Sequence, residues 1–119
     1  MFLSHSRWDH VYARALADQL ESAGVRTWIA GPTRHARGWW DDVSVNLECA
    51  AAVMVLMTEH SRCAAGVRQE VDEARRTGKP LIPILLSGDP FLLEPAEDVR
   101  GGTLPSDGLI RRVKLLCVS

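Results

Sequence analysis

The 119-residue sequence has little excess charge, few cysteines and no long apolar run, and each absence excludes a class of protein. A formal net charge of −1 gives no overall basic field that would attract nucleic acid. Three scattered cysteines do not make a disulfide framework and fit a reducing compartment, so we expect a cytoplasmic protein. No apolar run approaches the roughly 20 residues of a membrane-spanning helix, and the first residues lack the features of a signal peptide.

The sequence also lacks the motifs of several common nucleotide and phosphate sites. No Gly-x-Gly-x-x-Gly follows the first predicted strand, where the loop Ser4–Trp8 has no glycine, and there is no Walker A loop. The third predicted strand ends in Met57-Thr58-Glu59, without the clustered aspartates of a phosphate-accepting regulator. A Rossmann-type dinucleotide-binding fold, a P-loop enzyme and a response regulator are therefore excluded.

Two small groups of reactive side chains do not match known sites. Ser4, His5 and Asp9 are too close in sequence for the geometry of a catalytic triad. His60 and Cys63 are a single i, i+3 pair, which is too few ligands for a structural zinc site. We therefore expect no bound metal.

A predicted helix in the middle of the sequence places one carboxylate among apolar residues. Val67, Glu70, Val71 and Ala74 follow the i, i+3, i+4, i+7 spacing of a single helical stripe. Three of the four are apolar, so the stripe should face a sheet and Glu70 should face it too. A carboxylate on an inward stripe needs a partner, a proton or a cleft. Glu70 is therefore the first candidate for a functional residue.

Predicted strands and helices alternate along the chain. The strands are Phe2–Ser4, Val25–Ile29, Ala51–Met57 and Leu81–Leu86, with a weaker fifth strand at Val99–Leu104. Helical stripes are predicted on Val11, Ala15, Leu16, Leu20 and Ala23, on Val43, Leu47 and Ala50, on Val67–Ala74, and on Leu109, Ile110, Val113 and Leu116, with a short helix within Phe91–Asp98. The alternation indicates right-handed βαβ units and an open parallel sheet with helices on both faces.

Three further features of these elements can be predicted, namely the loops where a ligand would bind, the residues that cap the helices, and the place of one proline in the sheet. Ligands of such sheets bind beyond the carboxyl ends of the strands, where the predicted loops are His5–Asp9, Ala30–Gly38 and Thr58–Ala65. Asp9 is a plausible N-cap, and Gly24 and Gly78 are predicted to end their helices. Pro83 lacks a backbone donor, so its strand must lie at a margin of the pairing or beside a short neighbour.

Four motifs, in order, resemble those of Toll/interleukin-1 receptor (TIR) domains. They read FLSHSRWD at 2–9, GVRTW at 24–28, GWW at 38–40 and VRQEVDEARRTGKPLIP at 67–83. The resemblance is most complete over residues 1–88 and has a bacterial style. We interpret residues 1–119 as a single TIR domain excised from a longer multidomain protein.

The resemblance implies a flavodoxin-like sheet of five parallel strands and one of two functions. Many TIR domains cleave the nicotinamide–ribose bond of NAD+, and some cyclise the remaining ADP-ribose. Such enzymes include effectors of bacterial immune or cell-death signalling that self-assembly activates. Others are non-catalytic modules that only assemble with further TIR domains. The implied partners are NAD+ as a substrate, other TIR domains and other domains of a longer chain, with no separate cofactor, nucleic acid or membrane.

Glu70 matches the catalytic glutamate of the cleaving members, and the chemistry is reasonable. Loss of nicotinamide leaves a ribose with oxocarbenium character, which a nearby carboxylate stabilises. The leaving group is already a cationic pyridinium, so no general acid is required. A structural role for Glu70, bonded to backbone amides, is the alternative.

The resemblance also supplies candidates for binding the substrate: Ser4, His5, Arg7, Arg34, Arg37 and Trp40. Trp40 would stack on nicotinamide or adenine, or would simply pack at the start of its helix. Arg7 would meet the pyrophosphate, as would Arg34 and Arg37 unless these two contact a neighbouring subunit. The alternative for Ser4 is a hydrogen bond to the strand-end backbone, and for His5 a supporting role in its loop.

Two positions depart from the family pattern. Gly66 stands where a tryptophan usually precedes the glutamate, and Ala30 stands where an acid often follows the second strand. These departures keep the assembly-module hypothesis open beside the enzyme hypothesis. A composite site built across two copies would reconcile the two hypotheses.

Overall fold

The fold is a single parallel sheet covered by helices. The computed structural model describes residues 1–29 and 39–118, apart from the side chains of Trp39 and Val118. The strands are β1 (Phe2–Ser4), β2 (Trp28–Ile29), β3 (Val53–Met57), β4 (Leu81–Leu85) and β5 (Glu97–Asp98). All four pairings are parallel, in the order β2-β1-β3-β4-β5. This order is that of flavodoxin-like sheets, so the predicted fold class is confirmed.

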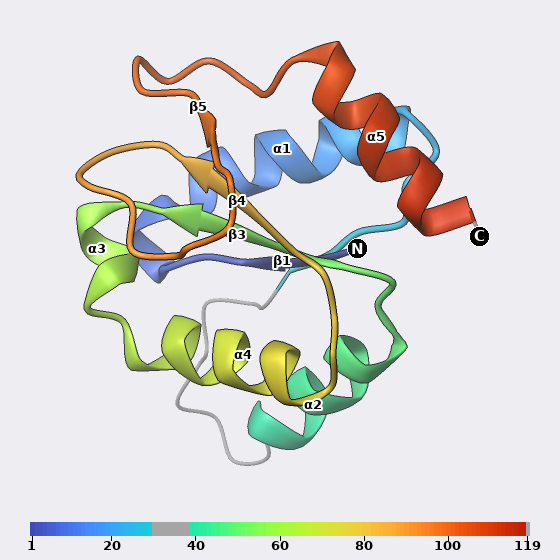
Figure 1. Cartoon of the computed structure of the whole chain (residues 1–119), viewed down its shortest axis with the longest axis vertical. Coiled ribbons are helices and arrows are strands. Elements are labelled where there is room, and N and C mark those ends of the chain that lie inside the picture. Colours follow the sequence, from blue (N-terminus) through green and yellow to red (C-terminus); the bar gives the residue numbers. More distant parts are fainter. Residues whose placement is uncertain (30–38, 119) are drawn as a thin grey trace.

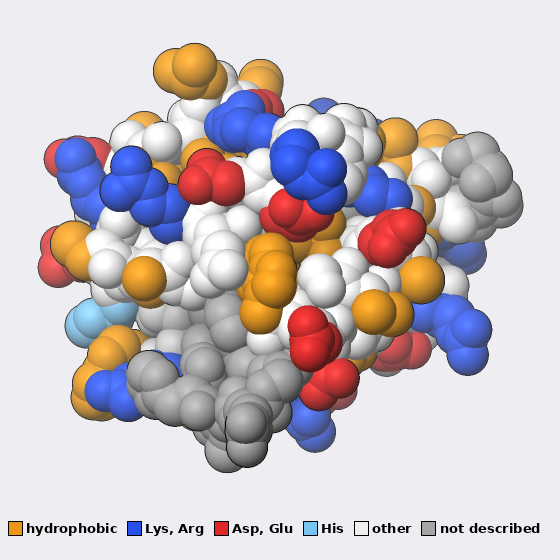
Figure 2. All heavy atoms as spheres, turned by 90° about the horizontal axis from the view of Figure 1, so that it is seen from below, with side chains coloured by type: hydrophobic (Ala, Val, Ile, Leu, Met, Phe, Trp, Pro, Cys, Tyr) orange, Lys and Arg blue, Asp and Glu red, His pale blue; other side chains and the backbone are white. Residues whose placement is uncertain are grey.

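Helices cover both faces of this sheet (Figure 1). They are α1 (His10–Ser22), α2 (Trp39–Cys49), α3 (Glu59–Arg62), α4 (Ala65–Arg76) and α5 (Asp107–Val118), with a 3₁₀ turn η1 (Arg7–Asp9) before α1. Helices α1 and α5 lie on one face, and α2 and α4 lie on the other, while the short α3 follows the carboxyl end of β3 (Figure 1). On the face of α2 and α4, acidic and basic side chains are interspersed (Figure 2).

Strand β3 lies at the centre of the sheet and is buried on both sides. Its even-numbered residues Met54 and Leu56 pack with α1 and α5, while Val53, Val55 and Met57 pack with α2 and α4. A central parallel strand is covered on both faces and is therefore apolar throughout. The prediction of a central strand here is confirmed, although the strand begins at Val53 rather than Ala51.

Proline 83 is accommodated because its neighbour strand is short. Pro83 pairs with Val55 of β3, whereas β5 reaches only Ile84 and Leu85 of β4. The missing backbone donor therefore lies where β5 does not extend, which is one of the two conditions predicted for a proline in this strand.

The first helix is rotated relative to its predicted stripe. Its buried residues are Ala13, Leu16, Ala17 and Leu20, whereas Val11 is 85% exposed and Ala15 is also exposed. Leu16 and Leu20 define the inner face, and the alanines one turn away let the helix approach the sheet closely. The prediction that Val11 and Ala15 face the core was wrong. The helix does end before Gly24, which has φ 89°.

Other boundaries also differ from the predictions. The second strand is shorter because the Val25 amide still bonds to the Leu20 carbonyl at the end of α1. The predicted loop Thr58–Ala65 contains the short helix α3. Leu116 of α5 was predicted to pack inward but is 42% exposed. The predicted inward residues of α2, Val43, Leu47 and Ala50, are buried as expected.

The fifth strand was placed too far along the chain. It occupies Glu97–Asp98, and no helix forms within Phe91–Asp98. Val99 is buried, and its amide bonds to the Leu85 carbonyl at 2.8 Å. This apolar residue therefore lies at the end of the pairing between β4 and β5 and not at its start. Gly101 and Gly102 follow with φ of 120° and 86°, which ends the extended backbone.

Within residues 1–29 and 39–118, no helix is both long enough and apolar enough to cross a membrane.

Candidate active site

Glu70 lies inside the protein on the inner stripe of α4. Val67, Val71 and Ala74 of this stripe are buried as predicted, and Glu70 itself has 0% exposure. The hydroxyl Oγ of Ser4 donates a hydrogen bond of 2.6 Å to Glu70 Oε1. This length lies within the range of hydrogen bonds donated by a hydroxyl to an oxygen acceptor. Of the three predicted possibilities, a partner, a proton or a cleft, the structure shows a partner, the last residue of β1.

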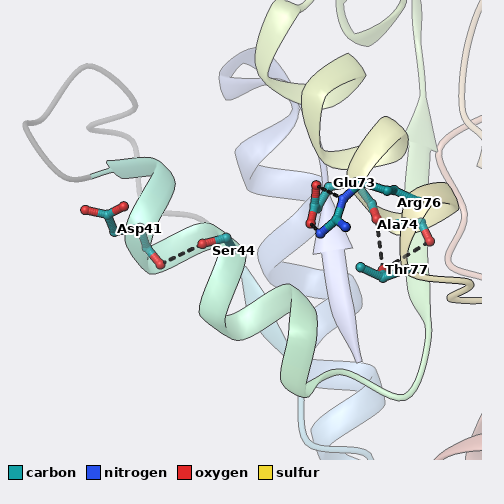
Figure 3. A network of polar contacts seen from close by, with 6 residues as sticks. All are labelled: Asp41, Ser44, Glu73, Ala74, Arg76 and Thr77. Atoms are coloured by element: carbon teal, nitrogen blue, oxygen red, sulfur yellow. Dashed lines mark hydrogen bonds and ion pairs between the residues drawn. The ribbon is translucent and has the colours of Figure 1, made fainter.

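The opposite end of α4 is held by local contacts. The Thr77 hydroxyl donates to the carbonyls of Glu73 and Ala74 (Figure 3). Gly78 follows with φ 71°, as predicted for the cap. Glu73 forms an ion pair with Arg76 on the exposed side of the helix. The hydrogen bond from Arg76 lowers the pKa of Glu73 below its ordinary value. Glu73 is thus an ordinary surface carboxylate, in contrast to the buried Glu70.

Asp9 connects two of the loops at the carboxyl ends of the strands. Its Oδ2 accepts a hydrogen bond of 2.7 Å from Ser6 Oγ and one of 2.6 Å from Thr58 Oγ1. Asp9 does occupy the N-cap position of α1, but its side chain makes no capping bond there. Its carboxylate instead joins the loop after β1 to the end of β3.

Thr58 and Ser61 form a capping box that sequence reasoning missed. The Thr58 amide donates to Ser61 Oγ at 2.8 Å, and the Ser61 amide donates to Thr58 Oγ1 at 3.0 Å. Both residues are buried. The spacing Thr-x-x-Ser resembles the capping-box pattern and was the available signal for α3.

His5 is buried beside the same loop. It is 1% exposed, and its Nε2 lies 3.3 Å from Nδ1 of His10, with the ring centroids 5.4 Å apart. One ring must donate and the other accept in this pair. The contact ties the loop to the first turn of α1, in accord with a supporting role for His5.

Arg7 and Trp8 lie on the outside of this loop. The Arg7 guanidinium carbon is 4.9 Å from the centroid of the Trp8 ring, and Trp8 is 68% exposed. The Trp8 ring also lies 6.0 Å from that of His60 on α3. These three side chains form an exposed basic and aromatic surface at the carboxyl ends of β1 and β3.

The structure brings together only part of the predicted substrate set. Ser4 contacts Glu70 directly, so the predicted bond from Ser4 to the strand-end backbone is replaced by this side-chain bond. Trp40 is half-buried and packs against the core between the sheet and α2 and α4. Arg34 and Arg37 lie outside the described residues.

Among the residues that the structure describes, no three His, Cys, Asp or Glu side chains are grouped so that they could hold a metal ion. The described polar groups of the site are instead hydroxyls, carboxylates and imidazoles bonded to one another.

Comparison with protein-family models gives a match to the TIR domain over residues 1–107. The chain is a TIR domain. The matched region extends beyond the motifs at 2–83 and includes β5. No curated protein matches the chain. In this TIR domain Gly66 is half-buried in the first turn of α4, one turn before Glu70.

Proposed function

We propose that this TIR domain cleaves the nicotinamide–ribose bond of NAD+, with Glu70 as the catalytic residue. The observation that carries the proposal is the complete burial of the Glu70 carboxylate on α4, bonded to Ser4 at the carboxyl end of β1. Burying a carboxylate costs free energy, so a wholly buried carboxylate near the carboxyl ends of the strands is a candidate for a functional residue. The carboxyl ends of parallel strands are also where such sheets bind ligands.

The reaction breaks the bond between ribose C1′ and the ring nitrogen of nicotinamide. The bonding electron pair goes to that nitrogen, which is cationic in NAD+, so nicotinamide leaves as a neutral molecule. The positive charge develops on the ribose, where the Glu70 carboxylate stabilises it. Attack by water gives ADP-ribose and releases one proton, whereas attack by an adenine nitrogen would give a cyclic isomer and release a proton in the same way.

Other residues of the site would bind the rest of NAD+. Arg7 is exposed on the loop after β1, and its guanidinium would bind the diphosphate. Trp40 would present an aromatic face to nicotinamide or adenine. Arg34 and Arg37 would act on the diphosphate or on a neighbouring copy. His5 would hold the loop that carries Arg7.

We further propose that the domain acts in the cytoplasm as an effector of bacterial immune or cell-death signalling, and that self-association activates it. Depletion of NAD+ would then be the output of the signal. A site completed by a second copy would be active only in the assembled state.

The second candidate function is non-catalytic assembly with other TIR domains. Two observations favour it, namely Gly66 in place of the usual tryptophan and the exposure of Trp8 and Val11 on the first helical segment. Exposed large apolar side chains are common where proteins contact one another. Both functions predict self-association, so only catalysis separates them.

The test is the release of nicotinamide from NAD+ by the purified domain over a wide range of protein concentrations. The enzyme hypothesis predicts equal loss of NAD+ and gain of nicotinamide, with a rate that rises faster than linearly with concentration. The assembly hypothesis predicts oligomers in sedimentation and no nicotinamide. Absence of nicotinamide at every concentration, including those at which the domain forms oligomers, would exclude the enzyme.

A further inference from the structure

Ser4 is the last residue of β1 and is separated from Glu70 by 66 positions in the sequence. Both side chains are wholly buried, and the Ser4 Oγ to Glu70 Oε1 distance is 2.6 Å. The backbone of Ser4 is in register with Val55 of β3 at the centre of the sheet. The hydroxyl therefore approaches the carboxylate from a strand that pairs with the central strand of the sheet.

A donor in this place restricts where the carboxylate can point. A glutamate side chain has several rotatable bonds and loses appreciable conformational entropy when it is fixed. A short bond to one carboxylate oxygen fixes the end of that side chain, and a bond donated to a carboxylate favours its ionised form. Catalysis by a carboxylate requires both the correct orientation and the negative charge.

We propose that Ser4 is a positioning residue that holds Glu70 Oε1 and so orients the carboxylate for reaction. This inference rests on the proposed function of Glu70. It replaces the earlier expectation that Ser4 binds the substrate, since the Ser4 hydroxyl is turned to Glu70. Ser4 therefore acts through Glu70 and makes no contact with NAD+.

Ser6 provides a matched control for Ser4. It is the same residue type in the same segment, it is 3% exposed, and its hydroxyl donates to a carboxylate at 2.7 Å. Its partner is Asp9, however, and not Glu70. A general effect of removing a buried hydroxyl from this segment would appear in Ser6→Ala as well as in Ser4→Ala.

The kinetic experiment measures kcat and KM for NAD+ in the parent, Ser4→Ala, Ser4→Thr and Ser6→Ala. We expect Ser4→Ala to lower kcat by about tenfold or more, the usual effect of losing a hydrogen bond to a charged group. KM should stay within about twofold, because Ser4 does not touch the substrate. Ser4→Thr, which keeps a hydroxyl, should recover most of kcat. An unchanged kcat in Ser4→Ala, or a change confined to KM, would overturn the inference.

A second measurement does not depend on activity. The carboxyl carbon of Glu70 is followed by ¹³C NMR as a function of pH in the same four proteins. Loss of the Ser4 bond should raise the titration midpoint of Glu70 in Ser4→Ala, with no change in Ser6→Ala. If Ser4→Ala does not fold, Ser4→Cys, a near-isosteric variant with a weak donor, takes its place.

The two measurements separate the two claims. Absence of nicotinamide release by the parent would refute the proposed function, while a raised midpoint in Ser4→Ala would still support the control of Glu70 by Ser4. Release of nicotinamide by the parent, with an unchanged midpoint and kcat in Ser4→Ala, would refute the role of Ser4 alone.

Discussion

Thr58 Oγ1 donates a hydrogen bond of 2.6 Å to Asp9 Oδ2, and so joins the end of β3 to the loop that follows β1. The same oxygen accepts the Ser6 hydroxyl at 2.7 Å. Strands β1 and β3 are neighbours in the sheet, and Ser4 of β1 bonds to Glu70. The segments that surround Glu70 are therefore tied together by hydroxyl groups that donate to carboxylates.

Replacing Asp9 tests the strength of this connection. Asp9→Ala removes the acceptor of two hydroxyl groups and should lower the free energy of unfolding by about 2–3 kcal/mol. Asp9→Asn keeps one acceptor oxygen and should cost less than half as much. Urea unfolding followed by tryptophan fluorescence measures both. Equal losses in the two variants would show that the acceptor bonds do not determine the effect.

Two glycine-to-alanine substitutions should have opposite effects. Gly78 has φ 71° after α4 with no atom near an added Cβ, so Gly78→Ala should destabilise the protein by about 1 kcal/mol through backbone strain alone. Gly108 lies in the first turn of α5, where an added Cβ meets Ser106 Oγ at 3.8 Å, an ordinary contact. Gly108→Ala should therefore stabilise the protein by about 0.5–1 kcal/mol. Thermal unfolding of both variants tests the difference in sign, and equal signs would contradict it.

Tyr12 gives a pH dependence that can be observed directly, because it is the single tyrosine of the sequence. Burial, and secondarily the charge of Glu97, raises its pKa from 10.0 to about 12. Its hydroxyl donates to the Thr103 carbonyl at 2.7 Å. The neutral form is favoured in the folded protein, so its contribution to stability is complete below pH 10 and is lost as the pH rises towards 12.

Absorbance at the tyrosinate band follows this ionisation. We expect a midpoint about two units higher in the folded protein than in urea. Tyr12→Phe should remove the transition and flatten the loss of stability between the two midpoints. A native midpoint equal to that of the unfolded chain would contradict the burial of this phenol.

The fold was predictable where the sequence pattern is local. The stripe that contains Glu70 placed all four residues correctly, because helical spacing alone decides which residues share a face. The central strand was identified from its uninterrupted apolar run. The spacing failed at Val11 and Ala15, since alanines on either side of the helix gave two nearly equivalent stripes and only packing chooses between them.

The candidate site was predictable only in part. The inward position of Glu70 followed from spacing, but its partner did not, because 66 residues separate Ser4 from Glu70 and pairing across a sheet leaves no local pattern. The roles of Asp9 and Thr58 were missed for the same reason. The short fifth strand was misplaced because Val99, the apolar residue predicted to start it, is buried just after its last paired residue.

The most direct test measures the release of nicotinamide from NAD+ by the parent and by two variants of α4, Glu70→Gln and Glu73→Gln. Glu73 is the control because it lies three residues further on, at the surface, paired with Arg76. With circular dichroism showing that all three are folded, we expect release by the parent and by Glu73→Gln. We expect at least about a hundredfold loss in Glu70→Gln, as for removal of a group that stabilises the transition state. Release by Glu70→Gln at the rate of the parent would contradict the proposed catalytic role of Glu70.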